Sequence, residues 1–325
     1  MAARQRAPEQ RLIQQVLQLA SRHARWVLVL GLLAGLLFQS VAAYTRPTIP
    51  LFIAALLFLA AFRIGPAVAF ADAASWYKQA RLVLICQLLV PVVAMLPLLL
   101  LPEIGVYATA LLLVLAAAPI SGSPNLVIML GFAPDAALRQ LIVGTALLPL
   151  TILPVLYFLP QLEGPLSVLE AALRLLLIIL LAACTGFLCR RLSRFQRLTA
   201  NDIACVDGLS AICMAMVVVG LMSAIGDAWR QRPADVVYMM LFAFAVNFGL
   251  QLLGSWFWPR VSDSSQHVSM TVISGNRNVA LFLAALPATV MNPLLVFVGC
   301  YQFPMYLTPL LLKGFYRLRY ATRRS

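Results

Sequence analysis

Long apolar segments, separated by short polar ones, run along almost the whole of this 325-residue chain. They fall near 26–44, 48–65, 80–101, 105–131, 138–160, 166–189, 203–225, 234–257, 267–286 and 290–313. A helix that crosses a bilayer needs about 20 apolar residues. The pattern therefore predicts an all-α integral membrane protein with about ten transmembrane helices.

The first 25 residues follow a different pattern. Apolar residues recur there at helical spacing between polar ones, at Leu12, Ile13, Val16, Leu17 and Ala20. A helix with one apolar face of this kind lies along a membrane surface. We expect an interfacial amphipathic helix, with a frayed cytoplasmic tail as the alternative. The stretch lacks the continuous apolar region of a signal peptide.

Composition excludes a soluble protein. The chain is 62% hydrophobic and 11% charged, whereas soluble domains carry about 25% charged residues. Its net charge of +13 is the mark of nucleic-acid binding in a soluble protein. In a membrane protein it indicates cytoplasmic loops rich in Arg and Lys, so we expect no nucleic-acid partner.

The positions of the basic residues predict an orientation. With ten spans, one side of the membrane holds four of the 24 Lys and Arg residues: Arg46, Arg174, Arg230 and Arg232. Arg277 lies inside an apolar segment, and the other 19 fall on the side of the N-terminus. Because positive residues collect in the cytoplasm, we expect both termini there, in a bacterial cytoplasmic (inner) membrane.

The chain also contains an internal repeat. ISGSPNL at 120–126 matches ISGNRNV at 273–279, at an offset of 153 residues. VGTALLPLTILP at 143–154 matches VGCYQFPMYLTP at 298–309, at an offset of 155. We therefore expect a cytoplasmic segment 1–25, five-helix repeats at 26–160 and 166–313, and a basic cytoplasmic tail 314–325. Five helices per repeat place the second copy in the opposite orientation, as in secondary transporters.

Both ISG segments interrupt an apolar helix, and the first also contains Pro119 and Pro124. Paired interruptions in two repeats indicate a substrate site near the middle of the membrane. We expect broken helices 4 and 9 to cross there, with half-helix N-termini that favour an anionic substrate. The substrate-binding candidates are Ser121, Ser123, Asn125, Ser274, Asn276, Arg277 and Asn278. For either motif alone, close helix packing through Gly and Ser is the alternative.

Other polar residues within apolar segments are weaker candidates. Asn247 is a candidate for lining a cavity, but interhelical hydrogen bonding explains it equally well. Gln302 and Thr145 are further candidates, because their spans would flank the crossing. Asp207 has three readings: a partner for Arg277, a proton carrier, or a helix cap near the interface. The six cysteines show no metal-ligand spacing. We interpret them as small apolar core residues and expect no metal site and no cofactor.

The topology and the two motifs resemble the bile acid:sodium symporters, a family of transporters with ten spans in two inverted repeats. The resemblance covers nearly the whole chain and is sharpest over 116–154 and 271–309. In the family, the first broken helix carries a Pro- and Gly-rich run that ends in Ser-Asn. Here Asn125 matches, whereas Pro124 stands where the family has serine. The resemblance implies a core of helices 3–5 and 8–10 that moves against a panel of helices 1–2 and 6–7.

The second motif departs from the family more sharply. The family reads Glu-Ser/Thr-Gly-x-Gln-Asn, and here Ile273 replaces the glutamate and Arg277 the glutamine. Those two family residues help to bind sodium. Isoleucine offers no oxygen ligand, and a guanidinium only donates hydrogen bonds. Our hypothesis is that Arg277 replaces a bound sodium ion or contacts an anionic substrate, with snorkelling or a structural pairing as the alternative.

The leading prediction is a secondary transporter of a small organic anion, working by alternating access, with the coupling ion open between sodium, a proton and none. Sodium coupling at the second motif is not expected. One alternative is a sensor or receptor built on the transporter fold. The other is a membrane-embedded lipid-modifying enzyme, which is disfavoured because the usual acidic and catalytic motifs are missing from the sequence. We therefore expect a protein that is not an enzyme.

Overall fold

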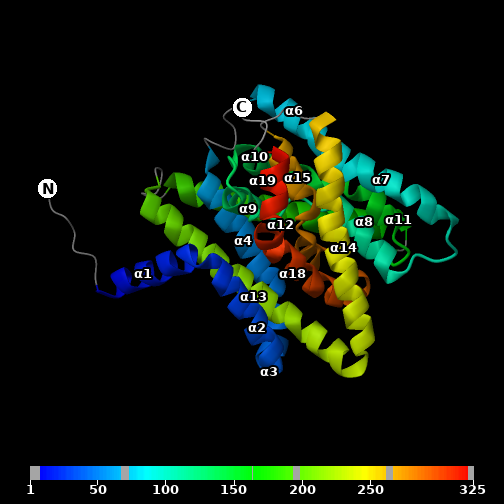
Figure 1. The fold of residues 1–325 in the computed structure, drawn as a ribbon, viewed down its shortest axis with the longest axis horizontal. Coiled ribbons are helices and arrows are strands. Elements are labelled where there is room, and N and C mark those ends of the chain that lie inside the picture. Colours follow the sequence, from blue (N-terminus) through cyan, green and yellow to red (C-terminus); the bar gives the residue numbers. More distant parts are fainter. Residues whose placement is uncertain (1–7, 67–72, 163, 193–197, 261–265, 321–325) are drawn as a thin grey trace. The chain divides into compact units, whose positions relative to one another are not determined.

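The computed structural model describes residues 8–66, 73–162, 164–192, 198–260 and 266–320. Within these ranges the elements are helices, and no strand occurs beyond one isolated pair of bridged residues. Figure 1 labels these helices along the chain. By their contacts they form two compact units. Unit 1 comprises 1–69 and 181–223, and unit 2 comprises 70–180 and 224–325. Each unit therefore takes helices from both halves of the sequence.

Seven helical stretches in the described residues are long and apolar enough to cross a membrane, and there are eight if one sharply bent pair is counted as a span. The seven are Gln39–Ile64, Trp76–Leu100, Asp135–Phe158, Gly164–Leu192, Ala200–Gln231, Pro233–Arg260 and Ala288–Leu311. This supports the prediction of an all-α membrane protein. Three predicted segments are absent from the seven: 26–44, most of which belongs to the bent pair, and 105–131 and 267–286, whose helices are interrupted.

Unit 1 begins with the predicted amphipathic helix, α1 (Pro8–Arg22). Its apolar side chains are largely exposed, with exposed fractions of 63% at Leu12 and 52% at Val16. The next helix, α2 (Ala24–Leu37), is bent from α1 by 88°. If α2 runs along the membrane normal, α1 therefore lies parallel to the membrane surface.

The first predicted span needs a correction. The segment 26–44 does not form one helix, because the helix ends at Leu37 and a new one begins at Gln39. From there the chain stays helical through α3 (Gln39–Thr45), η1 (Arg46–Thr48) and α4 (Ile49–Ile64). The segments 26–44 and 48–65 predict a loop between them, at Arg46 and Pro47. Proline is tolerated there because it occupies the first turn of a helical segment, where its missing N–H removes no helical bond.

Glycines let the helices of unit 1 approach closely. A Cβ added to Gly35 of α2 would lie 2.7 Å from the Cβ of Met222 in α13 (Ala200–Gln231). A Cβ on Gly186 of α12 (Gly164–Leu192) would lie 2.8 Å from that of Ala61 in α4. Both distances are too short for real carbon atoms. Such small-residue contacts are typical of helices that associate within membranes.

Unit 2 holds both interrupted segments. Its elements in the first half of the chain are α6 (Ala73–Val83), the π-helical η2 (Leu84–Leu89), α7 (Val90–Met95), η3 (Leu96–Leu100), α8 (Val106–Ala116), α9 (Ser123–Leu130), α10 (Asp135–Thr151) and α11 (Leu153–Phe158). Those in the second half are α14 (Pro233–Phe257), η4 (Trp258–Arg260), α15 (His267–Gly275), η5 (Val279–Leu281), α16 (Phe282–Ala285), α17 (Ala288–Met291), η6 (Asn292–Leu294), α18 (Leu295–Leu311) and α19 (Lys313–Tyr320).

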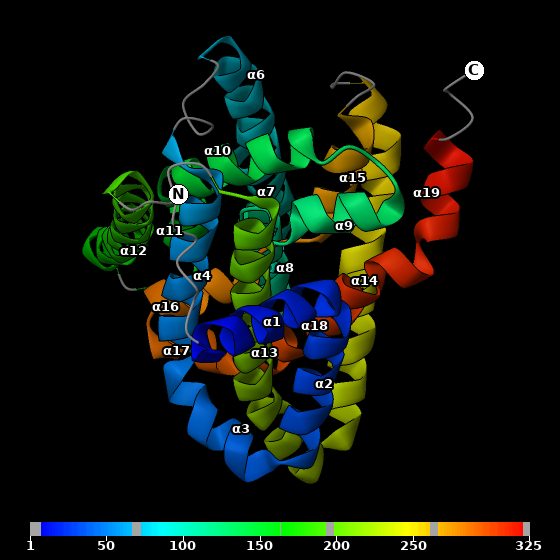
Figure 2. The same ribbon diagram turned by 90° about the vertical axis from the view of Figure 1, so that its left-hand side faces the viewer.

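The short helix α15 forms the centre of unit 2. All nine of its residues are buried. It packs against α14, α9 and α10, and α9 and α15 lie side by side (Figure 2). Polar backbone that is buried in protein in this way is shielded from lipid, where an unpaired N–H or C=O is costly. The fold thus places the second interruption inside a protein environment.

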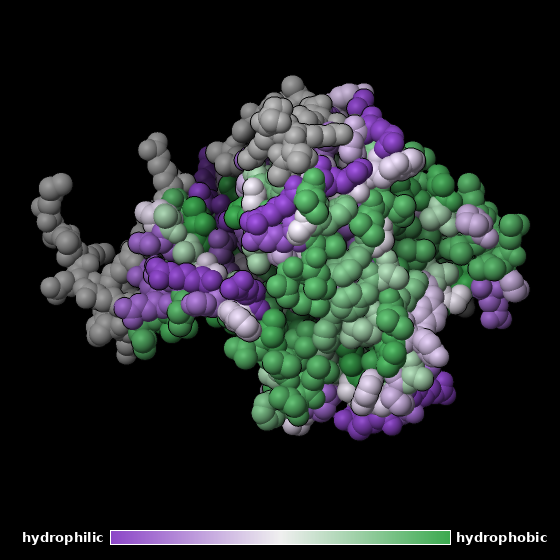
Figure 3. All heavy atoms as spheres, in the orientation of Figure 1, coloured by the Kyte–Doolittle hydropathy of each residue, from purple (hydrophilic) through white to green (hydrophobic). Residues whose placement is uncertain are grey.

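The outer surface of α14 is apolar along most of its length, with polar residues at its two ends (Figure 3). Its exposed side chains include Leu241 and Leu253. At the other end of the chain, the expected basic tail 314–325 begins as part of a packed helix, α19, in which Tyr316 and Tyr320 are buried. Residues 321–325 of that prediction lie outside the described residues.

Candidate functional site

The first ISG motif separates α8 from α9, and the second separates α15 from η5. Proline accounts for the first break. Pro119 has no N–H to donate, and Pro124 occupies the first turn of α9, where proline is favoured. The second break contains no proline. There Asn276 and Asn278 leave the helical conformation, with ψ angles of 81° and 63°.

The two interruptions pair with each other. Pro119 and Arg277 form an isolated antiparallel bridge. The N–H of Ile120 donates to the carbonyl of Asn276 at 3.0 Å, and the N–H of Asn278 donates to the carbonyl of Ala118 at 2.8 Å. Backbone groups released by each break thus find their partners in the other break, as buried backbone requires. The structure therefore brings the two predicted motifs together.

We call the paired segments 118–120 and 276–278 the crossing. Arg277 lies at this crossing, and its exposed fraction is only 3%. Its Nε donates to the carbonyl of Ser274 at 3.1 Å, and one terminal nitrogen donates to the carbonyl of Ala117 at 3.0 Å. No ion pair joins Arg277 to an acidic residue in the described parts of the chain. The two carbonyls belong to the C-terminal ends of α15 and α8. Helix C-termini carry partial negative charge, so they favour a cation at this point.

Cys86 completes the surroundings of Arg277 and was not predicted. The second terminal nitrogen of Arg277 contacts the Cys86 sulfur. Cys86 lies in the π-helical η2, and π-helical turns occur often at functional sites. The neighbouring Gln87 donates to the carbonyl of Gly144 at 3.3 Å, while its side-chain oxygen is buried with no partner in the described residues. The interpretation of Cys86 as a mere core residue was therefore incomplete.

The polar side chains of the second motif are engaged with protein. Ser274 donates to the carbonyl of Met270 at 2.8 Å and accepts a hydrogen bond from the Trp258 indole at 2.6 Å. Asn276 donates to the carbonyl of Val272 at 2.7 Å and accepts from Thr308 at 3.4 Å. Because these bonds are internal, both residues hold the broken helix in place.

A buried hydrogen-bonded chain supports the end of α15. Asn247 and Tyr301 both donate to the carbonyl of Gly275 at 2.5 Å. Gln251 donates to Asn247 at 2.8 Å and to Thr308 at 3.1 Å. Asn247 therefore has a structural role at the crossing. Polar side chains that replace lost helical hydrogen bonds are expected around an interruption of this kind.

The polar side chains of the first motif have fewer hydrogen-bond partners within the protein. Ser123 is buried, and its hydroxyl has no partner in the described residues. Ser121 is half-buried and Asn125 is exposed, and neither side chain forms a hydrogen bond with another described residue. The side chain of Asn278 in the second motif is half-buried and also forms no hydrogen bond with another described residue. These side chains remain available to a ligand.

The remaining candidates lie apart from these contacts. Gln302 is buried and donates to the carbonyl of Val298 in its own helix at 3.0 Å. Thr145 is half-buried and follows Gly144 on α10. Asp207 belongs to unit 1, where its carboxylate pairs with Arg63 at 2.6 Å. The partner that the structure gives Asp207 is therefore Arg63.

A scan against protein-family models finds no match for this chain, and a search of curated proteins finds none either. The geometry of the crossing is therefore the main basis for the functional argument.

Proposed function

We propose that this protein is a secondary transporter that moves a small organic anion across a membrane by alternating access. The observation that carries the proposal is the antiparallel pairing of two interruptions from corresponding places in the sequence repeat. Interrupted helices that meet in this way form substrate sites in transporters with inverted repeats. The resemblance to bile acid:sodium symporters supports the same reading.

The proposal includes ten spans. The interrupted segments α8–α9 and α15–α16 each count as one span, in addition to the seven continuous ones and α2, whereas α1 lies along the membrane surface. This topology places both termini in the cytoplasm of a bacterial inner membrane, because most Lys and Arg then lie on that side. It also makes the two five-helix repeats opposite in orientation.

An anion is the favoured substrate because the crossing holds a buried positive charge. A guanidinium has five N–H donors, and three bonds from Arg277 are formed within the protein. Arg277 can therefore still donate to a carboxylate or sulfate. Ser121, Asn125 and Asn278 have side chains without protein partners in the described residues. We propose that these three and Arg277 contact the substrate.

Arg277 also supplies the positive charge that a bound sodium ion would bring. Its guanidinium lies at the C-terminal ends of α8 and α15, where a cation is stabilised. Ile273 is 1% exposed on α15 and offers no oxygen to a metal ion. We therefore propose transport without sodium binding at this motif.

The two compact units support the proposed motion. Unit 2 contains the helices of predicted spans 3–5 and 8–10, and unit 1 contains those of spans 1–2 and most of span 7. The division lies close to the core and panel expected from the family resemblance. The first half of α12 is the exception, because it belongs to unit 2.

Uptake by the purified protein in proteoliposomes tests the function. Carboxylates and sulfonates of graded size are supplied outside, and protein-free liposomes give the background. We expect saturable uptake of at least one anion and a KM raised about tenfold or more by Asn125→Ala/Asn278→Ala, because each lost polar contact weakens binding. Asn201→Ala, an exposed change on α13, should behave as wild type.

Two results would contradict the proposal. Binding of an anion without any flux would favour a sensor built on the same fold. Magnesium-dependent conversion of a lipid substrate would favour a membrane-embedded enzyme.

A further inference from the structure

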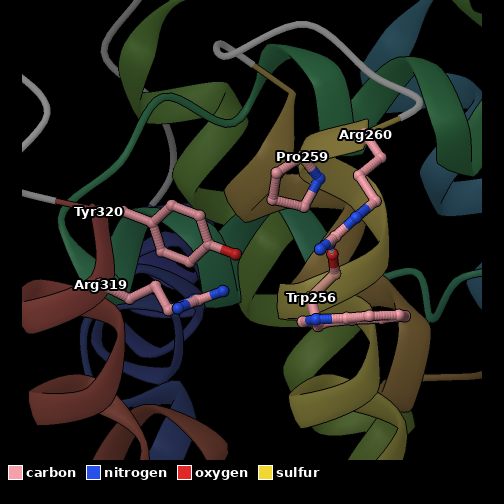
Figure 4. Close-up of a pocket in the computed structure, with 5 residues that line it drawn as sticks. All are labelled: Trp256, Pro259, Arg260, Arg319 and Tyr320. Carbon is pink, nitrogen blue, oxygen red and sulfur yellow. Dashed lines mark hydrogen bonds between the residues drawn. The ribbon is translucent and has the colours of Figure 1, made fainter.

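A cavity lies in unit 2, apart from the residues that contact Arg277. It has a volume of about 350 Å³ and is lined by Trp256, Pro259, Arg260, Arg319 and Tyr320 (Figure 4). Trp256 to Arg260 form the end of α14 and η4, whereas Arg319 and Tyr320 end α19. Segments far apart in the sequence thus build the cavity together.

The lining is basic and aromatic. Its two charged side chains are both arginines, and no acidic residue lines it among the described residues. Figure 4 shows that the guanidinium groups of Arg260 and Arg319 and the hydroxyl of Tyr320 point towards the same space. Two guanidinium groups in this arrangement suit a phosphate group, because arginine binds phosphate through paired N–H donors.

Protein contacts hold both arginines in position. The Arg260 guanidinium lies 4.1 Å from the centre of the Trp256 ring and donates to the Trp256 carbonyl. Arg319 donates to the carbonyl of Ser255 at 3.2 Å. These contacts use only part of the ten N–H donors of the two side chains. The remaining donors are free to face a ligand in the cavity.

The position of the cavity favours a lipid headgroup as the source of such a phosphate. It lies at the end of the candidate span Pro233–Arg260, while α19 directly follows the candidate span Ala288–Leu311. Span ends lie at the depth of lipid headgroups, where tryptophan is enriched. Trp256 is 60% exposed, and Leu252 and Leu253 are exposed one turn before it on α14. Acyl chains can cover that apolar surface while the phosphate enters the cavity.

We propose that this cavity binds the phosphate of an anionic phospholipid headgroup. Basic pockets between transmembrane helices bind anionic lipids through this chemistry. The hydroxyl of Tyr320 also shares a hydrogen bond of 3.0 Å with Thr271 of α15. The cavity is therefore connected directly to the helix that ends at the crossing.

Native mass spectrometry of the full chain, released from nanodiscs, tests the proposal. The protein is offered phosphatidylglycerol or phosphatidylcholine, and retained lipid is counted for each variant. We expect wild type to retain phosphatidylglycerol in preference to phosphatidylcholine. Arg260→Gln/Arg319→Gln should lower that retention about tenfold, because both guanidinium donors are lost.

The matched control, Arg317→Gln/Arg174→Gln, removes the same charge from exposed positions outside the cavity and should retain lipid as wild type does. The single variant Arg260→Gln keeps the bond between Arg319 and Ser255, so it tests the cavity without loosening α19. It should lose retention on its own.

Two outcomes would overturn the proposal. The first is unchanged phosphatidylglycerol retention in Arg260→Gln and the double variant. The second is displacement of the lipid from wild type by inorganic phosphate or glycerol 3-phosphate in detergent, which would assign the cavity to a soluble phosphate compound.

Discussion

At the scale of single residues, Arg277 is the most unusual feature of the chain. A buried charge without an opposite charge costs roughly several kcal/mol, even after the surroundings relax. Two helix C-termini offset part of this cost, each by about 0.3–1 kcal/mol and up to about 2 kcal/mol when buried. The position of Arg277 at the carbonyls of Ser274 and Ala117 explains how the charge is tolerated. It also leaves a positive potential that an anion can neutralise.

Substitution of Arg277 tests this structural role. Arg277→Gln should destabilise the protein by about 2 kcal/mol, because buried carbonyls lose a charged donor. Arg277→Lys should also destabilise it, because one ammonium group cannot reproduce the planar arrangement that reaches both carbonyls. Thermal unfolding in detergent measures both effects. Arg174→Gln removes an exposed surface ion pair and should change little. An unchanged midpoint for Arg277→Gln would show that these bonds contribute nothing to stability.

Glycine distinguishes the two motifs. A Cβ on Gly275 would overlap the carbonyl oxygen of Asn247, whereas a Cβ on Gly122 would meet nothing within 4 Å. Gly275→Ala should therefore destabilise the protein by about 3 kcal/mol or more, at or above the upper end for overpacking. Gly122→Ala should fold normally. Folded yield and unfolding midpoint in detergent are the measurements, and equal tolerance of both changes would contradict the close approach of α14 and α15.

Asp207 provides a test of proton coupling. Its ion pair with Arg63 is partly exposed, at 23% and 31%, so its loss should cost about 1 kcal/mol or less. We expect Asp207→Asn to keep wild-type anion uptake, with or without a pH gradient. Uptake that loses its response to a pH gradient in this variant would instead identify Asp207 as a proton carrier.

At the same scale, the sequence indicates where the unusual charge lies but not which distant residues it contacts. The Arg277 position was predictable because a charge inside an apolar repeat motif is conspicuous. Its contact with Cys86 was not, because 191 residues separate them and a buried cysteine is ordinarily an inert core residue. The pairing of Asp207 with Arg63, 144 residues away, was missed for the same reason.

At the scale of elements, continuous apolar segments were predicted well. The segment 166–189 corresponds to α12 (Gly164–Leu192), and 234–257 corresponds to α14 (Pro233–Phe257). The first interruption was visible because prolines mark it. The π-helical η2 and the break at Phe38 were not visible, since neither contains a glycine and tertiary packing decides such local changes.

We expect the amphipathic helix α1 to contact lipid through one of its faces. A fluorophore on a cysteine at position 12 or 16 should be quenched by nitroxide lipids, because Leu12 and Val16 are exposed apolar positions on one face. The same probe at Gln18, a half-buried position that helical spacing places on the side away from Leu12 and Val16, should be quenched less. A background without the native cysteines is used, and equal quenching at all three positions would contradict an interfacial orientation.

At the scale of the whole molecule, two divisions of the chain coexist. The sequence repeat divides it into consecutive halves, whereas packing divides it into units that each draw on both halves. A repeat is visible in the sequence because it leaves matching residues. A compact unit is not, because it depends on contacts between distant helices. The interruptions that contain the two matching motifs pair within unit 2, which links the two divisions.

We propose that a fixed positive charge at the crossing replaces a bound sodium ion. Anion uptake into proteoliposomes, with and without a sodium gradient, tests it most directly in wild type and in Arg277→Gln/Ile273→Glu. We expect wild-type uptake to be independent of the sodium gradient. Uptake by the double variant should require sodium, because this variant has an acid and an amide in place of the cation. Wild-type uptake that depends on sodium would contradict the account of Arg277.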